Sequence, residues 1–401
     1  IVFGDWSSDV CSSDLMTEFN TLQLDFVRQS WNGHTGRGNF VLNEDGTKTF
    51  RPGQGIGSNY WDILPIGGDD LYTTNLYHKA LLELADLEEA VLANPGWGIS
   101  HGPLALDPIG LRNHAARVRE VSNRKFWNPK TGRFAVCVDA DGRPHDYGFT
   151  FVNLDSIWYG LASEDHARAI LDWLSGKRLV EGDTSQGEDI YKWRFGPRAT
   201  TLRNIDWHGQ GWTAPESLPW GGQVQDGGAV LGFSFYDLWA RLKVKGPDDA
   251  WQRLKEIIAW EQECWAAGGY RAFYADGKQG TTLQGGGTAG GLGIDFEFFE
   301  SSLVPQILIY GFLGIEPKPD GLVFSPNLPS ACHELGVSNI LYRGCKLNLK
   351  ASNRRISLEL LDTPTEPIHL LLPGWWKLYS TGLEGDQFLI TEPGLYLFSR
   401  R

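Results

Sequence analysis

Apolar side chains recur every three to four residues along several stretches of the chain, which is the spacing of a helix with one buried face. The longest stretch runs from Tyr72 to Leu92, with a stripe formed by Leu76, Ala80, Leu84, Leu87 and Val91. Similar spacing predicts the tail of a helix at 19–31 and further helices at 109–127, 151–161, 164–174, 227–243, 248–266 and 295–313, the last interrupted at Pro305. About seven helices in successive pairs, joined by long loops, suggest a helical toroid.

Beyond Gly314 the apolar positions alternate with a period of two, which is typical of strands with one buried face. The alternating runs are Leu347, Leu349 and Ala351, then Ile356, Leu358 and Leu360, then Ile368, Leu370 and Leu372. We therefore predict a small antiparallel β domain over residues 315–401. A shorter β-hairpin is predicted after Trp127, with Asp141 and Gly142 at its turn.

Residues 176–226 show neither pattern and form a long irregular segment. In a compact domain such a loop is usually functional or disordered. This one contains Trp193, Trp207, Trp212 and Trp220. It is too apolar for a disordered segment, so we interpret it as a functional loop.

Asp62 lies between aromatic residues and a turn that opens the longest predicted helix. Tyr60 and Trp61 precede it, and a loop containing Pro65, Gly67 and Gly68 leads to Asp69 and Asp70, which are candidate helix caps. A carboxyl group beside flat aromatic rings can be desolvated, which raises its pKa as a general acid requires. The alternative is a structural Asp that forms a turn while Trp61 packs inward.

Composition excludes several classes of function. The 401 residues carry a net charge of −13, and no apolar run is long enough to span a bilayer. An acidic chain has no electrostatic preference for nucleic acid or for an anionic membrane. Four of the five cysteines, Cys137, Cys264, Cys332 and Cys345, are widely spaced and are expected to be buried thiols, which indicates neither a zinc site nor a disulfide framework. No metal or cofactor is expected.

Residues 1–15 are expected to be non-native. The stretch GDWSSDVCSSDL at residues 4–15 resembles a sequencing-library adapter translated in one reading frame. Without its three aspartates the net charge is −10. We expect these residues to lie apart from the core and the chain to be the C-terminal part of a longer gene product, inactive by itself. The sequence does not predict a cellular compartment, because the true N-terminus is not expected to be present.

Three segments resemble the six-hairpin glycosidases, a clan with an (α/α)6 barrel that includes amylo-1,6-glucosidases, trehalases, processing α-glucosidases and α-L-rhamnosidases. They are Tyr60-Trp61-Asp62 with the following helix, FWNPKTGRF at residues 126–134, and YGFLGIEPKPDGLVFSPNLP at residues 310–329. The resemblance implies a mainly α fold, with residues 16–314 forming the second half of the toroid. In several of these families the loop that matches Asp62 supplies the general acid.

The catalytic base is harder to place by this resemblance. Trehalases and related families carry a Glu between the last two helices, whereas here that position falls on or near Gln284, an amide that cannot act as a base. Asp226 is the preferred base because QVQDGG resembles an acid loop of the clan's α-fucosidase branch. Glu216, which lies between Trp212 and Trp220, is a close second. Asp295 and Glu297 are further candidates, although Asp295 more often reads as a helix cap.

We therefore expect a glycosidase that inverts the anomeric centre, with a glycoside, oligosaccharide or polysaccharide as substrate. Asp62 would protonate the leaving oxygen while a second carboxylate activates water. The residues expected to bind sugar are Trp61, Trp207, Trp212, Trp220, His208 and Gln284. Two alternatives remain: a sugar-binding or scaffold protein without activity, and a phosphorylase whose phosphate would bind near Arg194, Arg198 and Arg203.

Overall fold

The computed structural model describes Asp25, residues 28–29, 39–42, 45 and 48–51, Leu64, Ile66, and residues 68–99, 107–138, 142–204, 219–274 and 299–400. The adapter-like residues 1–15 lie outside these ranges, as does the predicted helix at 19–31 apart from Asp25 and residues 28–29. Arg28–Gln29 is a strand, β1, so the helical prediction is wrong at these two residues. The chain divides into two compact units. Unit 1 comprises Ile1–Tyr147, Tyr159–Ser163 and Asp206–Thr213, and unit 2 comprises Gly148–Trp158, Glu164–Ile205 and Ala214–Arg401.

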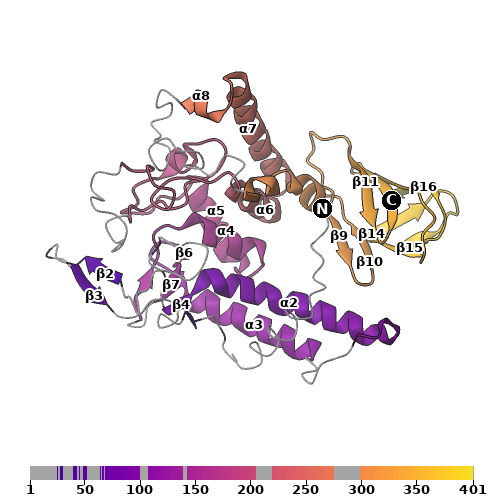
Figure 1. Ribbon diagram of the computed structural model, residues 1–401, viewed down its shortest axis with the longest axis horizontal. Helices are drawn as coiled ribbons and strands as arrows, with labels where there is room; N and C mark the ends of the chain where they lie inside the picture. Colours follow the sequence, from indigo (N-terminus) through magenta and orange to yellow (C-terminus); the bar gives the residue numbers. More distant parts are fainter. Residues whose placement is uncertain are drawn as a thin grey trace. The chain divides into compact units, whose positions relative to one another are not determined.

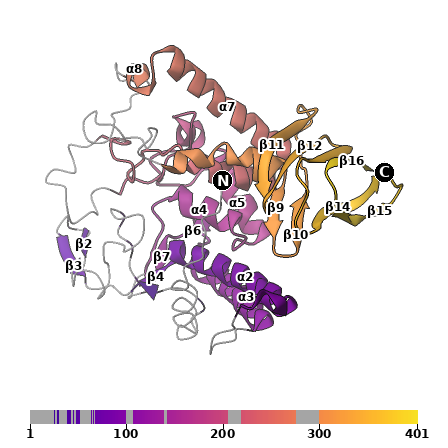
Figure 2. The ribbon, with the colours of Figure 1, turned by 45° about the vertical axis from the view of Figure 1, so that its right-hand side comes forward.

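Two helices dominate unit 1, and both were predicted from the apolar spacing. Helix α2 spans Leu71–Ala93 and helix α3 spans Pro108–Lys125, and they pack side by side (Figures 1 and 2). The buried residues of α3 include the predicted Leu111, Ala115 and Val118. The buried face predicted for α2 is wrong.

Leu76 and Leu87 of α2 are exposed, whereas the buried positions lie on a neighbouring face. That face comprises Leu71, Thr74, Asn75, Tyr77, His78, Leu81 and Ala85. Three of its members are polar, and a pattern built from apolar residues alone cannot include them. The Thr74 hydroxyl, for example, donates to the Asp70 carbonyl within the helix.

Asp70 begins α2 as predicted. Its buried carboxylate accepts hydrogen bonds from the Tyr72 backbone N–H (2.9 Å) and the Thr73 hydroxyl (2.5 Å), which satisfies groups that a helix start leaves unpaired. Asp69 instead forms an ion pair of 2.6 Å with Lys125 at the end of α3. The two acids therefore fix both the start of α2 and its position beside α3.

Short strands complete the described part of unit 1. β1, β4 (Gly68–Asp70), β7 (Cys137–Val138) and β8 (Pro144–His145) form one sheet in that order. β2 (Asn39–Leu42) pairs with β3 (Lys48–Arg51), and β5 (Trp127–Asn128) pairs with β6 (Arg133–Phe134). The predicted hairpin after Trp127 is thus two successive hairpins, β5–β6 and β7–β8.

We expect His78 to make the protein lose stability in mild acid. Burial, then the charges of Arg119 and Lys79, lowers the pKa of His78 to about 4. An unfolded chain with a His pKa near 6.5 binds more protons between pH 6.5 and 4, so stability falls as the pH falls through this window, by up to about 1.4 kcal/mol per pH unit.

Urea unfolding between pH 4 and 7 measures this effect. His78→Gln should flatten the pH dependence, whereas the exposed His369→Gln should leave it unchanged. An unaltered slope in His78→Gln would show that other groups cause it.

Unit 2 begins with four predicted helices, α4 (Thr150–Trp158), α5 (Glu164–Leu174), α6 (Phe233–Val244) and α7 (Pro247–Ala266). The short helix α8 (Tyr270–Tyr274) was not predicted. α6 starts six residues later than predicted because residues 227–232 belong to the preceding loop. α6 packs against α4 and α7.

The predicted helix at 295–313 is not a regular α-helix over its described part. Phe299–Leu303 is a 3₁₀ helix and Ile307–Phe312 a π-helix. Pro305 lies between them, and proline removes a backbone donor and hinders the preceding turn. Gly311 also packs closely, since a Cβ at this position would lie 2.7 Å from Ile307 and 3.0 Å from Leu242.

The C-terminal strands form one sheet in the order β11-β12-β13-β16-β14-β10-β9, and β15 pairs with β14. Their bounds are β9 (Ile315–Lys318), β10 (Gly321–Phe324), β11 (Leu335–Tyr342), β12 (Cys345–Ala351), β13 (Arg355–Leu360), β14 (Ile368–Leu378), β15 (Glu384–Ile390) and β16 (Gly394–Arg400). The predicted alternating positions are all buried. β10 and β14 run parallel, so the sheet is mixed, and the prediction of a purely antiparallel domain is wrong.

The mistake has a simple origin. Alternation identifies each strand but not its neighbour, and β10 reaches β14 across three intervening strands of sequence. The fold therefore combines helices with a substantial curled sheet (Figures 1 and 2), and the description as mainly α is only partly supported. The apolar core is continuous from Leu238 and Leu254 of the helices to Leu347 and Leu358 of the sheet.

We expect Gly314→Ala to destabilise this junction strongly. Gly314 has φ +60°, and a Cβ would lie 2.1 Å from the Ser325 carbonyl oxygen, so both the backbone angle and a backbone atom oppose any side chain. The expected loss is about 2–4 kcal/mol by denaturant unfolding. Gly344→Ala is the matched control because it shares a positive φ without a nearby atom, and a similar loss there would contradict the steric explanation.

Candidate functional site

Two of the predicted site residues, Asp226 and Trp220, lie in the described part of the chain, and both belong to one loop of unit 2. The others lie outside it: Trp61, Asp62, Trp207, His208, Trp212, Glu216, Gln284 and Glu297, together with Asp295. The candidate site is therefore built from residues 219–228 and the segments that hold them.

Backbone hydrogen bonds fold residues 219–228 into a tight loop. Gly221 donates to the Asp226 carbonyl (3.0 Å), Asp226 donates to the Gln223 carbonyl (3.0 Å), and Gly228 donates to the same carbonyl (3.1 Å). The Gln223 side-chain oxygen accepts from the Gln225 backbone N–H. The loop thus carries its own internal scaffold, which holds the Asp226 backbone in one position.

Asp226 is a completely buried carboxylate. Oδ1 accepts a hydrogen bond of 2.6 Å from the Asn204 backbone N–H, and Oδ2 forms an ion pair of 3.2 Å with Nη1 of Arg203. The Arg203 side chain is 27% exposed, so it connects the buried acid to solvent. Buried charges in proteins are paired and hydrogen-bonded, and Arg203 and the Asn204 backbone provide such contacts here.

Thr200 and Asn204 tie a second segment to this loop. The Thr200 hydroxyl accepts from the Gly227 N–H (3.0 Å) and donates to the Gln225 carbonyl (3.2 Å). The Asn204 amide donates to the Gln225 carbonyl as well (2.9 Å). Asp226 is consequently held by two segments rather than by its own loop alone.

Trp220 packs against the same loop and is half-buried. A Cβ on Gly227 (φ +80°) would lie 2.5 Å from the Trp220 ring, so only glycine permits this packing. The indole N–H donates to the Ser185 hydroxyl (2.8 Å). The guanidinium of Arg198 lies 4.5 Å from the ring centre of Trp193 and 5.4 Å from that of Trp220.

The three arginines considered for phosphate each have an acidic partner. Arg194 binds Glu263 through both terminal nitrogens (2.9 and 2.5 Å), and Arg198 binds Asp189 (3.1 Å). Arg198 is also buried and donates to the Gly227 carbonyl. These contacts make Arg198 a support of the Asp226 loop.

Sequence reasoning did not identify Arg203 and Asn204 as partners of Asp226, or Thr200 as a partner of the residues on either side of it. They follow the buried residues Arg198 and Ala199, about 25 positions before the acid, and nothing in their spacing points to it. The only available signal was the density of polar side chains in TTLRN within a Trp-rich loop.

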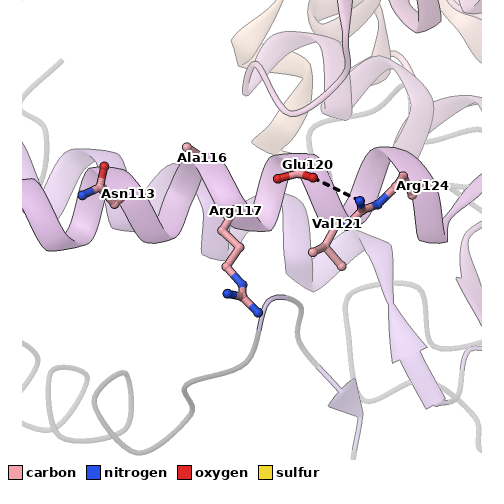
Figure 3. A pocket seen from close by; sticks show the side chains of 6 residues that line it. All are labelled: Asn113, Ala116, Arg117, Glu120, Val121 and Arg124. Carbon is pink, nitrogen blue, oxygen red and sulfur yellow. Dashed lines mark ion pairs between the residues drawn. The ribbon is translucent and has the colours of Figure 1, made fainter.

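The described parts include a cavity in each unit. One lies in unit 2, has a volume of about 620 Å³, and is lined by Tyr191, Arg253 and neighbours on α7. The other, of about 450 Å³, follows one face of α3 (Figure 3). Its six side chains come from a single helix and include the ion pair between Glu120 and Arg124, so it is a surface groove without convergent chemistry.

The described residues contain no cluster of His, Cys, Asp and Glu suited to a metal ion. Cys137, Cys264 and Cys345 are buried thiols as predicted, whereas Cys332 is half-buried. Within the same ranges, no helix has the length and apolar character needed to cross a bilayer.

Comparison with known families identifies the C-terminal sheet. Residues 315–375 match the family described as Glycosyl hydrolase family 65, C-terminal domain. This part of the chain therefore carries a domain of carbohydrate-active enzymes, which confirms the resemblance to glycosidases at residues 310–329. No curated protein sequence matches the chain.

Similar solved structures include two rhamnosidases and a putative phosphorylase. The GH78 family rhamnosidase of Bacillus sp. GL1 is 13% identical, with a TM-score of 0.43 over 83% of this chain and 29% of that chain. The putative kojibiose phosphorylase from the human microbiome is 12% identical (TM-score 0.34, 90% and 41%). The α-L-rhamnosidase from Dictyoglumus thermophilum is 11% identical (TM-score 0.41, 96% and 35%). The chain spans 29–41% of the length of these proteins.

Proposed function

We propose that the intact protein hydrolyses a glycosidic bond with inversion of the anomeric centre. In this mechanism Asp62 protonates the leaving oxygen and Asp226 activates the attacking water. The observation that carries the proposal is the Asp226 carboxylate, fully buried and held by Arg203 and by the Asn204 backbone beside Trp220. The glycosyl hydrolase domain at residues 315–375 supplies the chemical context.

The arrangement suits a base in two respects. A carboxylate fixed by a backbone N–H and an arginine is held in one orientation, and fixed orientation is a large part of catalytic efficiency. Gly221 and Gly227 let Arg198 and Trp220 pack directly against the loop backbone, which helps to hold the loop and its Asp226 in place. Glu216 and Glu297 remain alternative bases in the same mechanism.

The proposed sugar platform combines Trp220 with Trp61, Trp207 and Trp212, while His208 and Gln284 would hydrogen-bond sugar hydroxyls. The second candidate function is saccharide binding without catalysis, favoured by the amide at Gln284. A phosphorylase has less support, because the acidic partners of Arg194, Arg198 and Arg203 neutralise the charge that would hold phosphate.

The experiment that tests the proposal is hydrolysis of aryl glycosides by the full-length enzyme, with NMR identification of the first-formed anomer. We expect Asp62→Asn to lower kcat by about 10²–10⁴ on poor leaving groups, the usual contribution of a general acid. The loss should be much smaller on dinitrophenyl glycosides, which leave without protonation.

Glu83→Gln is the control for Asp62, because it changes an exposed carboxylate of α2. A first product with the retained configuration would overturn the inverting mechanism. Equal losses of Asp62→Asn on good and poor leaving groups would remove Asp62 as the acid, and saccharide binding without any turnover would favour the non-catalytic function.

A further inference from the structure

The cavity of about 620 Å³ in unit 2 is lined by side chains that the proposed catalysis does not use. Its wall comes from the 3₁₀ helix η2 (Gly187–Tyr191), from the end of α5, and from α6 and α7. The volume lies within the range of pockets that hold small organic ligands. The cavity is therefore large enough for a disaccharide.

A buried charge cluster makes this wall rigid. Asp237 is fully buried and accepts hydrogen bonds from the Tyr191 hydroxyl (2.8 Å), Arg241 Nε (2.9 Å) and Arg253 Nε (3.3 Å). The guanidinium of Arg253 also lies 4.2 Å from the ring centre of Tyr191. Four side chains from three elements thus fix one another and hold this wall in one arrangement.

Arg253 points to a missing partner. It lines the cavity and is about 95% buried, and its Nη1 binds Glu256 (2.7 Å). Its Nη2 is a buried donor with no acceptor among the residues that the structure describes. Leaving a buried donor unsatisfied costs about 1–3 kcal/mol, so a group that accepts from Nη2 is expected at this wall.

The balance of charge indicates what kind of ligand supplies that group. Three arginines of the lining, Arg194, Arg241 and Arg253, are matched by three acids, Glu188, Asp249 and Glu256. Asp249 and Glu256 already pair with Arg241 and Arg253. Asp237 and Glu263 also pair with these arginines, so the pocket has no free positive charge for an anion, while its exposed Glu188 and Gln252 offer hydrogen-bonding groups close together.

We propose that this cavity is a second saccharide site, which binds a neutral oligosaccharide through its hydroxyl groups. A hydroxyl both accepts and donates, so one sugar can accept from Arg253 and Gln252 while donating to Glu188 or Glu256. The site goes beyond the proposed active site, because none of its residues is a proposed catalytic or platform residue. Binding here is measurable without turnover.

The test is saturation-transfer NMR and calorimetry with maltose, cellobiose and trehalose as probes on this chain. We expect at least one disaccharide to bind with a dissociation constant of about 1 mM or below. The double variant Glu188→Ala/Gln252→Ala changes two exposed side chains of the lining and should weaken binding about tenfold.

Glu261→Gln, an exposed acid of α7 outside the lining, is the matched control and should bind like the parent protein. Trp220→Ala separates the two sites, since it removes a residue of the proposed sugar platform and should leave this binding intact. The proposal is overturned if no disaccharide binds at a concentration tenfold above the expected dissociation constant. It is also overturned if inorganic phosphate displaces the sugar. The third contrary result is that Trp220→Ala abolishes binding while the double variant does not. Failure of the hydrolysis assay alone leaves this site unaffected.

Discussion

Asp226→Asn lowers kcat by about 10²–10⁴ in the full-length enzyme, according to the proposed mechanism, because an amide cannot accept the proton of the attacking water. Asn retains an oxygen that can accept from the Asn204 backbone N–H, so this contact of the loop is kept. Substrate affinity should change far less than turnover. Initial-rate kinetics on the best aryl glycoside, together with calorimetric binding of the substrate, give both quantities.

Arg203→Gln distinguishes a base from a structural acid. The substitution removes the ion pair between Arg203 and Asp226 by changing the more exposed partner, and it leaves the Asp226 carboxylate in place. If Asp226 is the base, Arg203→Gln keeps turnover within about tenfold of the parent enzyme, because the carboxylate that accepts the proton is still present. Equal losses in the two variants would mean that only the ion pair matters.

Asp237→Ala destabilises unit 2 by about 3–5 kcal/mol, the range found when one member of a buried ion pair is removed. The substitution leaves Arg241 and Arg253 buried and facing each other without the carboxylate that lies between them. The Tyr191 hydroxyl loses its acceptor as well. Burial, and then the Asp237 charge, raises the pKa of Tyr191, so this hydroxyl is a donor at neutral pH.

Urea unfolding at pH 7 measures the effect, with Asp249→Ala as the matched control. Asp249 binds the same Arg241 at 2.8 Å, but its side chain is 37% exposed, and such pairs contribute about 1 kcal/mol or less. A loss in Asp249→Ala as large as that in Asp237→Ala would show that burial does not set the cost.

Local sequence located three helices well, whereas α6 starts six residues later than predicted and the helix predicted at 295–313 is not a regular α-helix. The predicted boundaries of α5 agree with the structure at both ends, and those of α2 and α7 differ by one residue. The choice of buried face on α2 failed because it depends on what packs there, and three polar residues turned out to be buried. Likewise, the alternating apolar positions after Gly314 predicted the strands correctly. They could not predict that β14 pairs in parallel with β10, because that pairing joins residues nearly fifty positions apart.

The candidate site also contains a residue that the sequence predicts and residues that it does not. Asp226 could be proposed from its glycine neighbours and a family resemblance, but its partners Arg203 and Asn204 could not, since the pairing is made by tertiary contacts between two irregular segments. The Asp237 cluster was also missed. An aspartate inside a helix next to Leu238 and Trp239 reads as a surface residue until the arginines of α6 and α7 are placed around it.

The parallel pairing of β10 with β14 has a consequence for the order of folding. β9–β10, β11–β12, β12–β13 and β14–β15 are neighbours along the chain, so each pair closes only a short loop. Joining Leu322 to Leu370 requires a much larger loop, and non-local pairings of this kind form slowly. We therefore expect the local hairpins to form early and the β10–β14 seam to close last, so that the edge of β14 is the surface most exposed to mispairing with another copy during refolding.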